Sequence, residues 1–197
     1  MPSRPRTLAF KAGTLRGFGL IVLLAISGPT LSAEQVTNPE YQLKAVFLFN
    51  FLQFVEWPTS AFSNSDSPIR IGVLGDDPFG PILERAFQGE TIRHRPLVVE
   101  RSNHLEDLKD SHLIFVSKSE KAHFPEILSQ FNSKNTLTVS ETEGFARRGG
   151  IINFYLEGKK VRFEINTNAA QNHGLKLSSQ LLGLGKIINP EEPKGEK

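Results

Sequence analysis

The sequence predicts one α/β domain of three layers, a mostly parallel sheet of about four strands extended by a C-terminal β-hairpin, with helices on both faces. Three observations predict it. Short apolar runs alternate with amphipathic stretches between residues 69 and 140. The run Leu113–Val116 is apolar without interruption, as in a strand that is covered on both faces. Two further strand-like runs flank the turn Glu157-Gly158-Lys159, which indicates a hairpin.

The stretch from Tyr41 to Pro58 is expected to be a helix around which the domain is organised. Asn38 is suited to cap this helix, Pro39 suits its first turn, and Pro58 is expected to end it. The apolar residues fall on two adjoining stripes, Leu43, Val46, Phe47, Phe51 and Phe54 on one and Ala45, Leu48, Phe49, Leu52 and Val55 on the other. A helix that is apolar on nearly all sides is covered on nearly all sides. It is therefore either an ordinary core helix or a core helix that also carries a partner surface.

Four strands are expected along the middle of the chain, after a polar loop at Thr59–Pro68. They are Ile69–Leu74, Leu97–Glu100, Leu113–Val116 and Thr136–Ser140. Each run is rich in β-branched or other apolar residues, and the first is expected to be a central strand. Helices are expected between the strands, because parallel neighbours need a crossover connection.

These connecting helices are expected over residues 79–88, 105–109 and 120–131. Asp77 is a candidate cap for the first of them, and Ser117 or Ser119 for the last. Gly89 is expected to stop the first helix.

The C-terminal part is expected to form a hairpin and a last helix. The hairpin strands are Ile151–Leu156 and Lys160–Asn166. The last helix is expected to run from Ala169 towards Ile188 behind an Asn168 cap, with a bend or break at Gly174. Its apolar face would hold Leu177, Leu181, Leu184 and Ile188.

The first 33 residues have the pattern of a secretory signal peptide. Basic residues precede the apolar run Leu20–Ile26, and small residues then lead to Ala33. An uncleaved amino-terminal anchor is the alternative. Residues 34–189 are therefore predicted to form the domain, residues 190–197 are predicted to be a disordered tail, and the protein is expected to be periplasmic.

Charge and composition exclude two classes of function. Residues 1–33 hold four basic residues and no acidic one, so the rest of the chain has 19 basic against 21 acidic residues, a formal charge of −2. A nucleic-acid-binding domain needs a concentrated basic surface, and none is expected here. The chain has no cysteine, which excludes disulfides and thiol chemistry.

No known catalytic, cofactor or metal motif stands in the sequence. The five histidines lack the spacing of a zinc site. The glycines after the first strand, Gly72, Gly75 and Gly80, match neither the dinucleotide fingerprint nor a P-loop. We therefore expect no enzyme, no cofactor and no metal. A hydrolase site that assembles only in space stays open as an alternative.

The segment Arg147-Arg148-Gly149-Gly150 has two interpretations. Two guanidinium groups beside two glycines would suit an anion, and the more common alternative for such a segment is a solvated turn. In open parallel sheets, ligands bind beyond the carboxyl ends of the strands. Segments 75–79, 117–119 and 140–143 would then surround a pocket.

Four stretches of this chain resemble the YfiR-like family of bacterial periplasmic proteins, which includes HmsC-like proteins. They are EYQLKAVFLFNFLQFVEWP, IRIGVLGDDPFG, GGIINFYLEGKKVRFEINTNAA and GLKLSSQLLGLGKII. The resemblance covers residues 41–189. It implies a single α/β domain that often dimerises.

The resemblance also implies a regulatory role. Family members bind the periplasmic region of an inner-membrane diguanylate cyclase and repress it, which lowers cyclic di-GMP and biofilm formation. An OmpA-like outer-membrane protein can sequester the repressor. Redox control through disulfides does not carry over, because this chain has no cysteine.

A repressor of this kind works through protein contacts. We expect Phe49, Leu52, Leu182 and Gly185 to be partner or dimer contacts, since they lie on the first helix, which is apolar on nearly all sides, and on the glycine-bearing last helix. The alternative is a periplasmic module that binds a small solute or anion, with Arg147 or Arg148 as the ligand contact.

Overall fold

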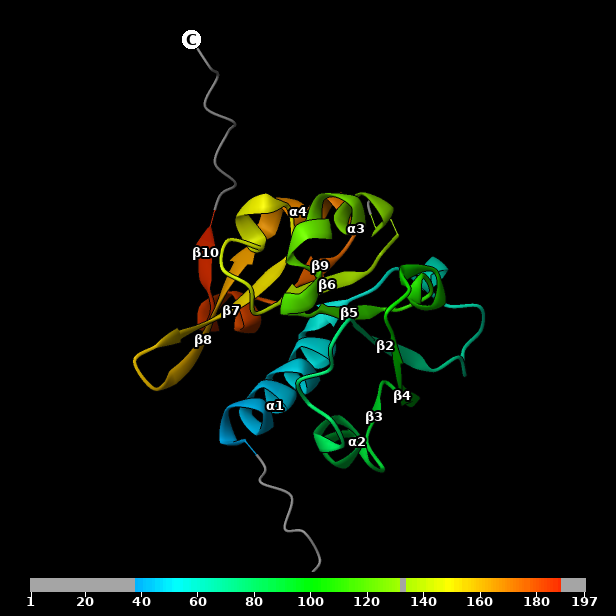
Figure 1. Ribbon diagram of the computed structural model, residues 1–197. Coiled ribbons are helices and arrows are strands. Elements are labelled where there is room, and N and C mark those ends of the chain that lie inside the picture. The colour runs from blue at the N-terminus through cyan, green and yellow to red at the C-terminus, as the bar shows by residue number, and fades with distance from the viewer. Residues whose placement is uncertain (1–37, 132–133, 189–197) are drawn as a thin grey trace, which may run out of the picture. The chain divides into compact units, whose positions relative to one another are not determined.

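The structure is a computed structural model that describes residues 38–131 and 134–188 (Figure 1). The predicted signal peptide and C-terminal tail lie outside the described residues, so the predicted domain limits stay predictions. All described residues belong to one structural unit.

The centre of the fold is an eight-stranded mixed sheet with the order β10-β8-β7-β6-β5-β2-β4-β3. The pairs are parallel except β7 with β8 and β3 with β4. The strands are β2 Ile69–Leu74, β3 Thr91–Ile92, β4 Arg95–Ser102, β5 Leu113–Val116, β6 Leu137–Ser140, β7 Ile152–Glu157, β8 Lys160–Asn166 and β10 Lys186–Ile188. The predicted α/β class is confirmed. The sheet has more strands than expected because β3 and β10 are too short to be recognised from sequence.

The central position of β2 is also as predicted. It pairs in parallel with β4 on one side and with β5 on the other, and Ile71 lies opposite both Val99 and Leu113. The antiparallel hairpin of β7 and β8 extends the sheet on the far side of β6.

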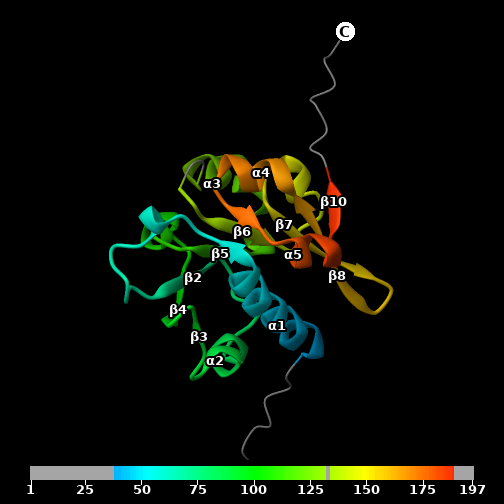
Figure 2. The ribbon, with the colours of Figure 1, turned by 180° about the vertical axis from the view of Figure 1, so that it is seen from behind.

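Helix α1, Pro39–Phe54, lies across one face of the sheet (Figures 1 and 2). As predicted, Asn38 caps it, and the side chain of Asn38 accepts a hydrogen bond from the Glu40 amide at 3.0 Å. The helix ends earlier than predicted. Val55–Glu56 forms a short strand, β1, that pairs antiparallel with β9, Lys176–Leu177. This pairing joins residues far apart in sequence, which local pattern alone does not reveal.

Two apolar cores lie on the two faces of the sheet. Residues of α1 and α2 pack on one face, and residues of α3 pack on the other (Figure 1). Alternate residues of β5 contact the two cores, with Leu113 and Phe115 in the first core and Ile114 and Val116 in the second. The sheet is therefore covered on both faces, as the uninterrupted apolar run of β5 predicted.

The connecting helices are shorter than predicted. Helix α2 spans Ile82–Phe87, and η2 at Leu105–Leu108 is a 3₁₀ turn. The predicted helix over 120–131 is divided into η3, a 3₁₀ segment at Lys118–His123, and α3, Phe124–Phe131. Two further 3₁₀ turns are η1, Thr59–Ala61, and η4, Ala146–Arg148.

Of the caps predicted for these connections, Ser117 is present and Asp77 is not. The Ser117 side chain accepts a hydrogen bond from the Ser119 amide at the start of η3. The N-cap of α2 is Pro81, and the Asp77 side chain instead accepts a hydrogen bond from the Phe79 amide at 2.8 Å, in the turn before the helix. The caps therefore mark where the chain turns, more reliably than where each helix begins.

The predicted C-terminal helix is broken at Gly174, as expected, but the prediction that it continues as a helix towards Ile188 is wrong. The segment forms α4, Thr167–Asn172, then β9, then α5, Ser179–Leu184, and finally β10. The cap of α4 is Asn166 in place of Asn168, and its side chain accepts a hydrogen bond from the Ala169 amide at 2.9 Å. Gly174 takes a φ of 68°, which glycine tolerates and which ends the helical path.

Candidate functional site

A polar cavity of about 470 Å³ opens beside the carboxyl ends of β5 and β6. Its charged lining residues are three cations and four carboxylates, Lys44, Lys118, Arg147, Glu40, Glu141, Glu143 and Glu164. This is the edge at which open α/β sheets bind ligands. Of the three segments that the sequence predicted around a pocket here, 117–119 and 140–143 contribute to the lining, and 75–79 does not.

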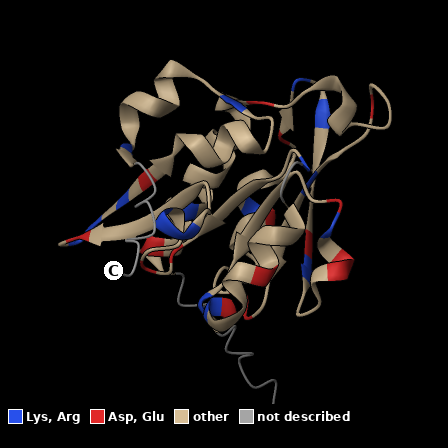
Figure 3. Ribbon diagram, turned by 90° about the horizontal axis from the view of Figure 1, so that it is seen from above, with Lys and Arg blue, Asp and Glu red and all other residues tan. Residues whose placement is uncertain are grey.

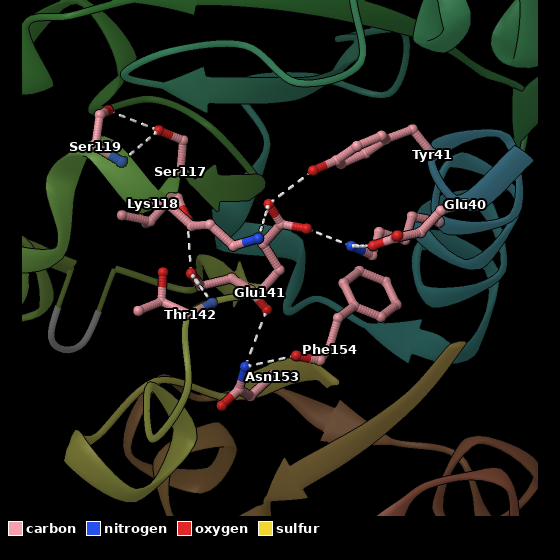
Figure 4. Close-up of polar contacts among 12 residues, drawn as sticks. Glu40, Tyr41, Ser117, Lys118, Ser119, Glu141, Thr142, Asn153 and Phe154 are labelled. Atoms are coloured by element: carbon pink, nitrogen blue, oxygen red, sulfur yellow. Dashed lines mark hydrogen bonds and ion pairs between the residues drawn. The ribbon is translucent and has the colours of Figure 1, made fainter. Parts of the chain in front are cut away.

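Glu141 is the centre of a buried charge network at this cavity (Figure 4). Lys44 of α1 forms ion pairs with Glu141 and with Glu40, one helical turn before it. The Tyr41 hydroxyl donates to Glu141 Oε1 at 3.0 Å, and the Lys118 ammonium lies 3.2 Å from the same oxygen. The side chains of Lys44 and Glu141 are only 3% and 5% exposed, so this ion pair ties α1 to the end of β6 with little access to solvent.

The network shifts the ionisation of its members. Burial raises the pKa of Glu141, but hydrogen bonds and charges from Lys44, Tyr41 and Lys118 outweigh burial and hold the pKa below its usual value. Burial and the neighbouring Glu141 carboxylate raise the pKa of Tyr41 far above its usual range. At neutral pH the carboxylate is therefore charged and the phenol is a hydrogen-bond donor.

Sequence reasoning missed this network. Lys44 is a charged residue in the middle of an apolar helix, and that position was the signal. A lysine surrounded by apolar residues needs a buried partner, but the partner stands 97 residues away in the chain.

Ser117 and Ser119 lie at the neighbouring strand end. Their hydroxyl oxygens are 2.7 Å apart, and the Asp76 amide donates to Ser119 Oγ at 3.1 Å. A side chain at Gly75 would collide with both serines, since an added Cβ would lie 2.3 Å from Ser119 Oγ. These residues fix the β2 and β5 turns to each other.

The structure separates the two arginines that were candidates for anion contacts. Arg147 lines the polar cavity. Arg148 donates to the Glu143 carbonyl oxygen at 2.8 Å and lies over the Phe124 ring, 5.3 Å from its centre. Arg148 therefore holds its own turn together, and only Arg147 is placed to meet a ligand in this cavity.

The four predicted partner contacts differ in accessibility. Leu52 is fully buried in the first core, so its side chain is not available at the surface of this fold. Phe49 is half-buried, with its ring centre 6.2 Å from that of Phe87. Leu182 is half-buried against the same core, and Gly185 is packed so closely on Phe163 that an added Cβ would lie 2.6 Å from the ring.

Other apolar side chains are more exposed than these four. Leu43 and Val46 on α1 are 43% and 50% exposed. Leu184 at the end of α5 and Ile187 on β10 are 63% and 52% exposed. Helix α1 packs against α5 and α5 against β10, so the four residues lie on neighbouring elements. We call Leu43, Val46, Leu184 and Ile187 the apolar surface.

Charged residues are distributed over the described ribbon without a large cluster of one sign, as seen from above in Figure 3. Within residues 38–131 and 134–188, no group of three or more histidines and carboxylates is arranged to hold a metal ion. In the same part of the chain, no helix is long and apolar enough to cross a membrane.

Comparison with known proteins identifies a family and a fold. The model of the YfiR/HmsC-like family matches residues 41–186. No curated protein gave a match.

Among solved structures, a conserved domain protein of Vibrio cholerae is similar with a TM-score of 0.52 and 12% identity, over 75% of this chain and 59% of that one. The ABC domain of a Streptococcus pneumoniae protein, in complex with L-Trp, is similar with a TM-score of 0.50 and 12% identity, over 76% and 62%. This chain thus spans less than two thirds of either structure, and at such identity the likeness concerns the fold alone.

Proposed function

The chain belongs to the YfiR/HmsC-like family, and from that premise we propose that it is a periplasmic regulatory protein that represses an inner-membrane diguanylate cyclase. It binds the periplasmic region of the cyclase and lowers cyclic di-GMP, and with it biofilm formation. Residues 1–33 direct export and are removed, residues 34–189 form the regulatory domain, and residues 190–197 form a tail. This activity needs no catalytic group and no cofactor.

The observation that carries the proposal is the exposure of Leu43 and Val46 on α1. The other face of this helix is fully buried, as Ala45 and Leu48 are 0% exposed. An exposed apolar side chain on a core helix gains about 25 cal/mol for each Å² that a partner covers. Leu184 and Ile187 extend the same kind of surface to the neighbouring elements.

Several partners can compete for such a surface. The cyclase, an OmpA-like outer-membrane protein and a second copy of this chain are the partners that we propose. If binding is mutually exclusive, a repressor that is bound to another partner cannot bind the cyclase. Affinity differences of a few kcal/mol are enough to shift the repressor from one partner to another. Phe49 and Leu182, both half-buried, would border the contact, with Gly185 beneath it.

The test is the concentration of cyclic di-GMP in cells that lack the gene and in complemented cells. Deletion should raise cyclic di-GMP, and only an export-competent copy should restore it. A copy with Leu43→Glu and Val46→Glu should fail to restore it, because the new charges would have to be desolvated at the interface.

The matched control is Gln130→Glu, which adds a carboxylate at an exposed position of α3 on the opposite face of the sheet. This copy should restore repression fully. If the doubly substituted α1 copy, present at normal levels in the periplasm, also restores it, the α1 surface is not the contact.

A second candidate function is the binding of a small solute. The observation that favours this function is the cavity of about 470 Å³ at the strand ends, which Arg147 helps to line. Candidate solutes should raise the midpoint of thermal unfolding in a concentration-dependent way if they bind. Arg147→Ala should abolish the rise, and Arg148→Ala should retain it.

A further inference from the structure

A second cavity, of about 450 Å³, lies at the opposite edge of the sheet, beside the amino ends of β2 and β5. Its charged lining residues are three cations, Arg70, Lys109 and Lys134, and one carboxylate, Asp110. Ser60 of η1 also lines the cavity, and the loop after η1 adds Ser63 and Ser67. The lining is thus positive and rich in hydroxyl groups, unlike that of the cavity at the carboxyl ends.

Two of the cations have their ion-pair partners outside the cavity lining. Arg70 is paired with Glu100, which is not among the lining residues. Lys109 lies 4.0 Å from Glu106, also outside the lining, and both side chains are more than half exposed. Such an exposed ion pair contributes little free energy, so Lys109 can leave Glu106 and bind another anion with little loss of stability.

The loop that forms one wall is held in place by other elements. Arg95 donates to the carbonyl oxygens of Asn64 and Ser67 at 2.9 and 2.7 Å, and its guanidinium lies 3.8 Å from the centre of the Phe62 ring. Phe62 in turn stacks on His112, with ring centres 4.6 Å apart. A polar loop of this composition would be mobile in water, and these contacts order it as a wall.

His112 completes the wall but is not a free ligand group. The Arg70 amide donates to its Nδ1 at 3.1 Å, so Nε2 carries the hydrogen and donates to the Ala61 carbonyl oxygen at 3.0 Å. Burial lowers the pKa of His112 and outweighs the opposing hydrogen bond to Ala61. The charges of Arg70 and Arg95 lower the pKa further, and that of Asp110 raises it. The imidazole is therefore neutral at pH 7.

We propose that this cavity binds a tetrahedral oxyanion, either free or as the monoester of a small organic molecule. Ammonium and guanidinium groups with hydroxyl donors are the groups that bind phosphate and sulfate oxygens. Small-molecule sites span about 300–1,000 Å³, so a cavity of about 450 Å³ has room for an organic group beside the anion. The site is separate from the apolar surface. The proposal of oxyanion binding therefore does not depend on the proposal of cyclase repression.

The test is calorimetric titration of the purified protein with inorganic phosphate, sulfate and glycerol 3-phosphate, at an ionic strength held constant with sodium chloride. We expect saturable binding of at least one of the three. Tighter binding of the ester than of phosphate identifies a monoester as the ligand, and equal binding identifies the free anion.

The variant Lys109→Ala/Lys134→Ala should weaken this binding at least about tenfold, because each charge-assisted hydrogen bond contributes a factor of that size. Lys160→Ala, which removes an exposed lysine from the β7–β8 hairpin, should leave the affinity unchanged. Absence of saturable binding, or equal weakening in both variants, would overturn the proposal.

Discussion

Lys44 of α1 and Glu141 at the end of β6 form an ion pair that is almost completely withdrawn from water, with side chains 3% and 5% exposed. The pair fixes the organising helix to the carboxyl edge of the sheet. It also forms part of the wall of the polar cavity. Its removal should therefore reveal how far the position of α1 depends on polar contacts in addition to apolar packing.

We expect Lys44→Met to lower the free energy of unfolding by about 3 kcal/mol, because it leaves a carboxylate buried without its main partner. Urea denaturation at pH 7 measures the loss. The double variant Lys44→Met/Glu141→Gln should recover part of it, since no uncompensated charge remains. A loss below about 1 kcal/mol for the single variant would mean that the pair behaves as an exposed one.

Gly185 provides a test of close packing between α5 and β8. A Cβ at this position would lie 2.6 Å from Phe163 and 2.7 Å from Ile165, so Gly185→Ala should destabilise the protein by about 1–3 kcal/mol. Gly183→Ala is the matched control, because nothing lies within 4 Å of its added Cβ. In helix α5 this change should stabilise by up to about 1 kcal/mol. Equal effects of the two substitutions on the urea midpoint would refute this account.

The sequence predicted elements whose signal is local. The caps Asn38 and Ser117, the apolar run of β5 and the alternation in β8 depend on neighbouring residues, and the structure has them as expected. It did not predict what depends on distant partners. The short strands β1 and β9 form by pairing with each other, and β10 forms by pairing in parallel with β8.

The candidate sites follow the same division. Apolar residues on α1 were recognised, but the side of the helix that the sheet covers depends on its orientation. Leu52 is therefore in the core, whereas Val46 is exposed. The Lys44–Glu141 pair and the cavity beside His112 arise from residues that meet only in the folded chain.

Leu52 and Val46 should accordingly respond differently to truncation. Leu52→Ala should lower the free energy of unfolding by about 2–5 kcal/mol, because it removes a fully buried side chain and leaves a cavity. Val46→Ala should change it by less than about 0.5 kcal/mol, as expected at the surface. Chemical denaturation of both variants checks this. A large loss for Val46→Ala would mean that the exposed face of α1 is covered in the protein in solution.

Stability should also fall on mild acidification, owing to the buried histidines. Burial is the main cause that lowers the pKa of both His112 and His173 in the folded state. The unfolded chain, with a histidine pKa near 6.5, then binds protons that the folded chain does not. The contribution of each histidine to stability is complete at a pH above the unfolded pKa. It is lost as the pH falls below the unfolded pKa towards the lower pKa of the folded state.

For His112 the physical reason is explicit. Its Nδ1 accepts a hydrogen bond from the Arg70 amide, and a proton on that nitrogen would place two donors against each other. The urea midpoint should therefore decrease between pH 7.5 and about pH 5.5. His112→Gln should lower stability at pH 7.5 and flatten this pH dependence, while replacement of the exposed His104 should do neither. An unchanged slope in His112→Gln would assign the acid sensitivity to other groups.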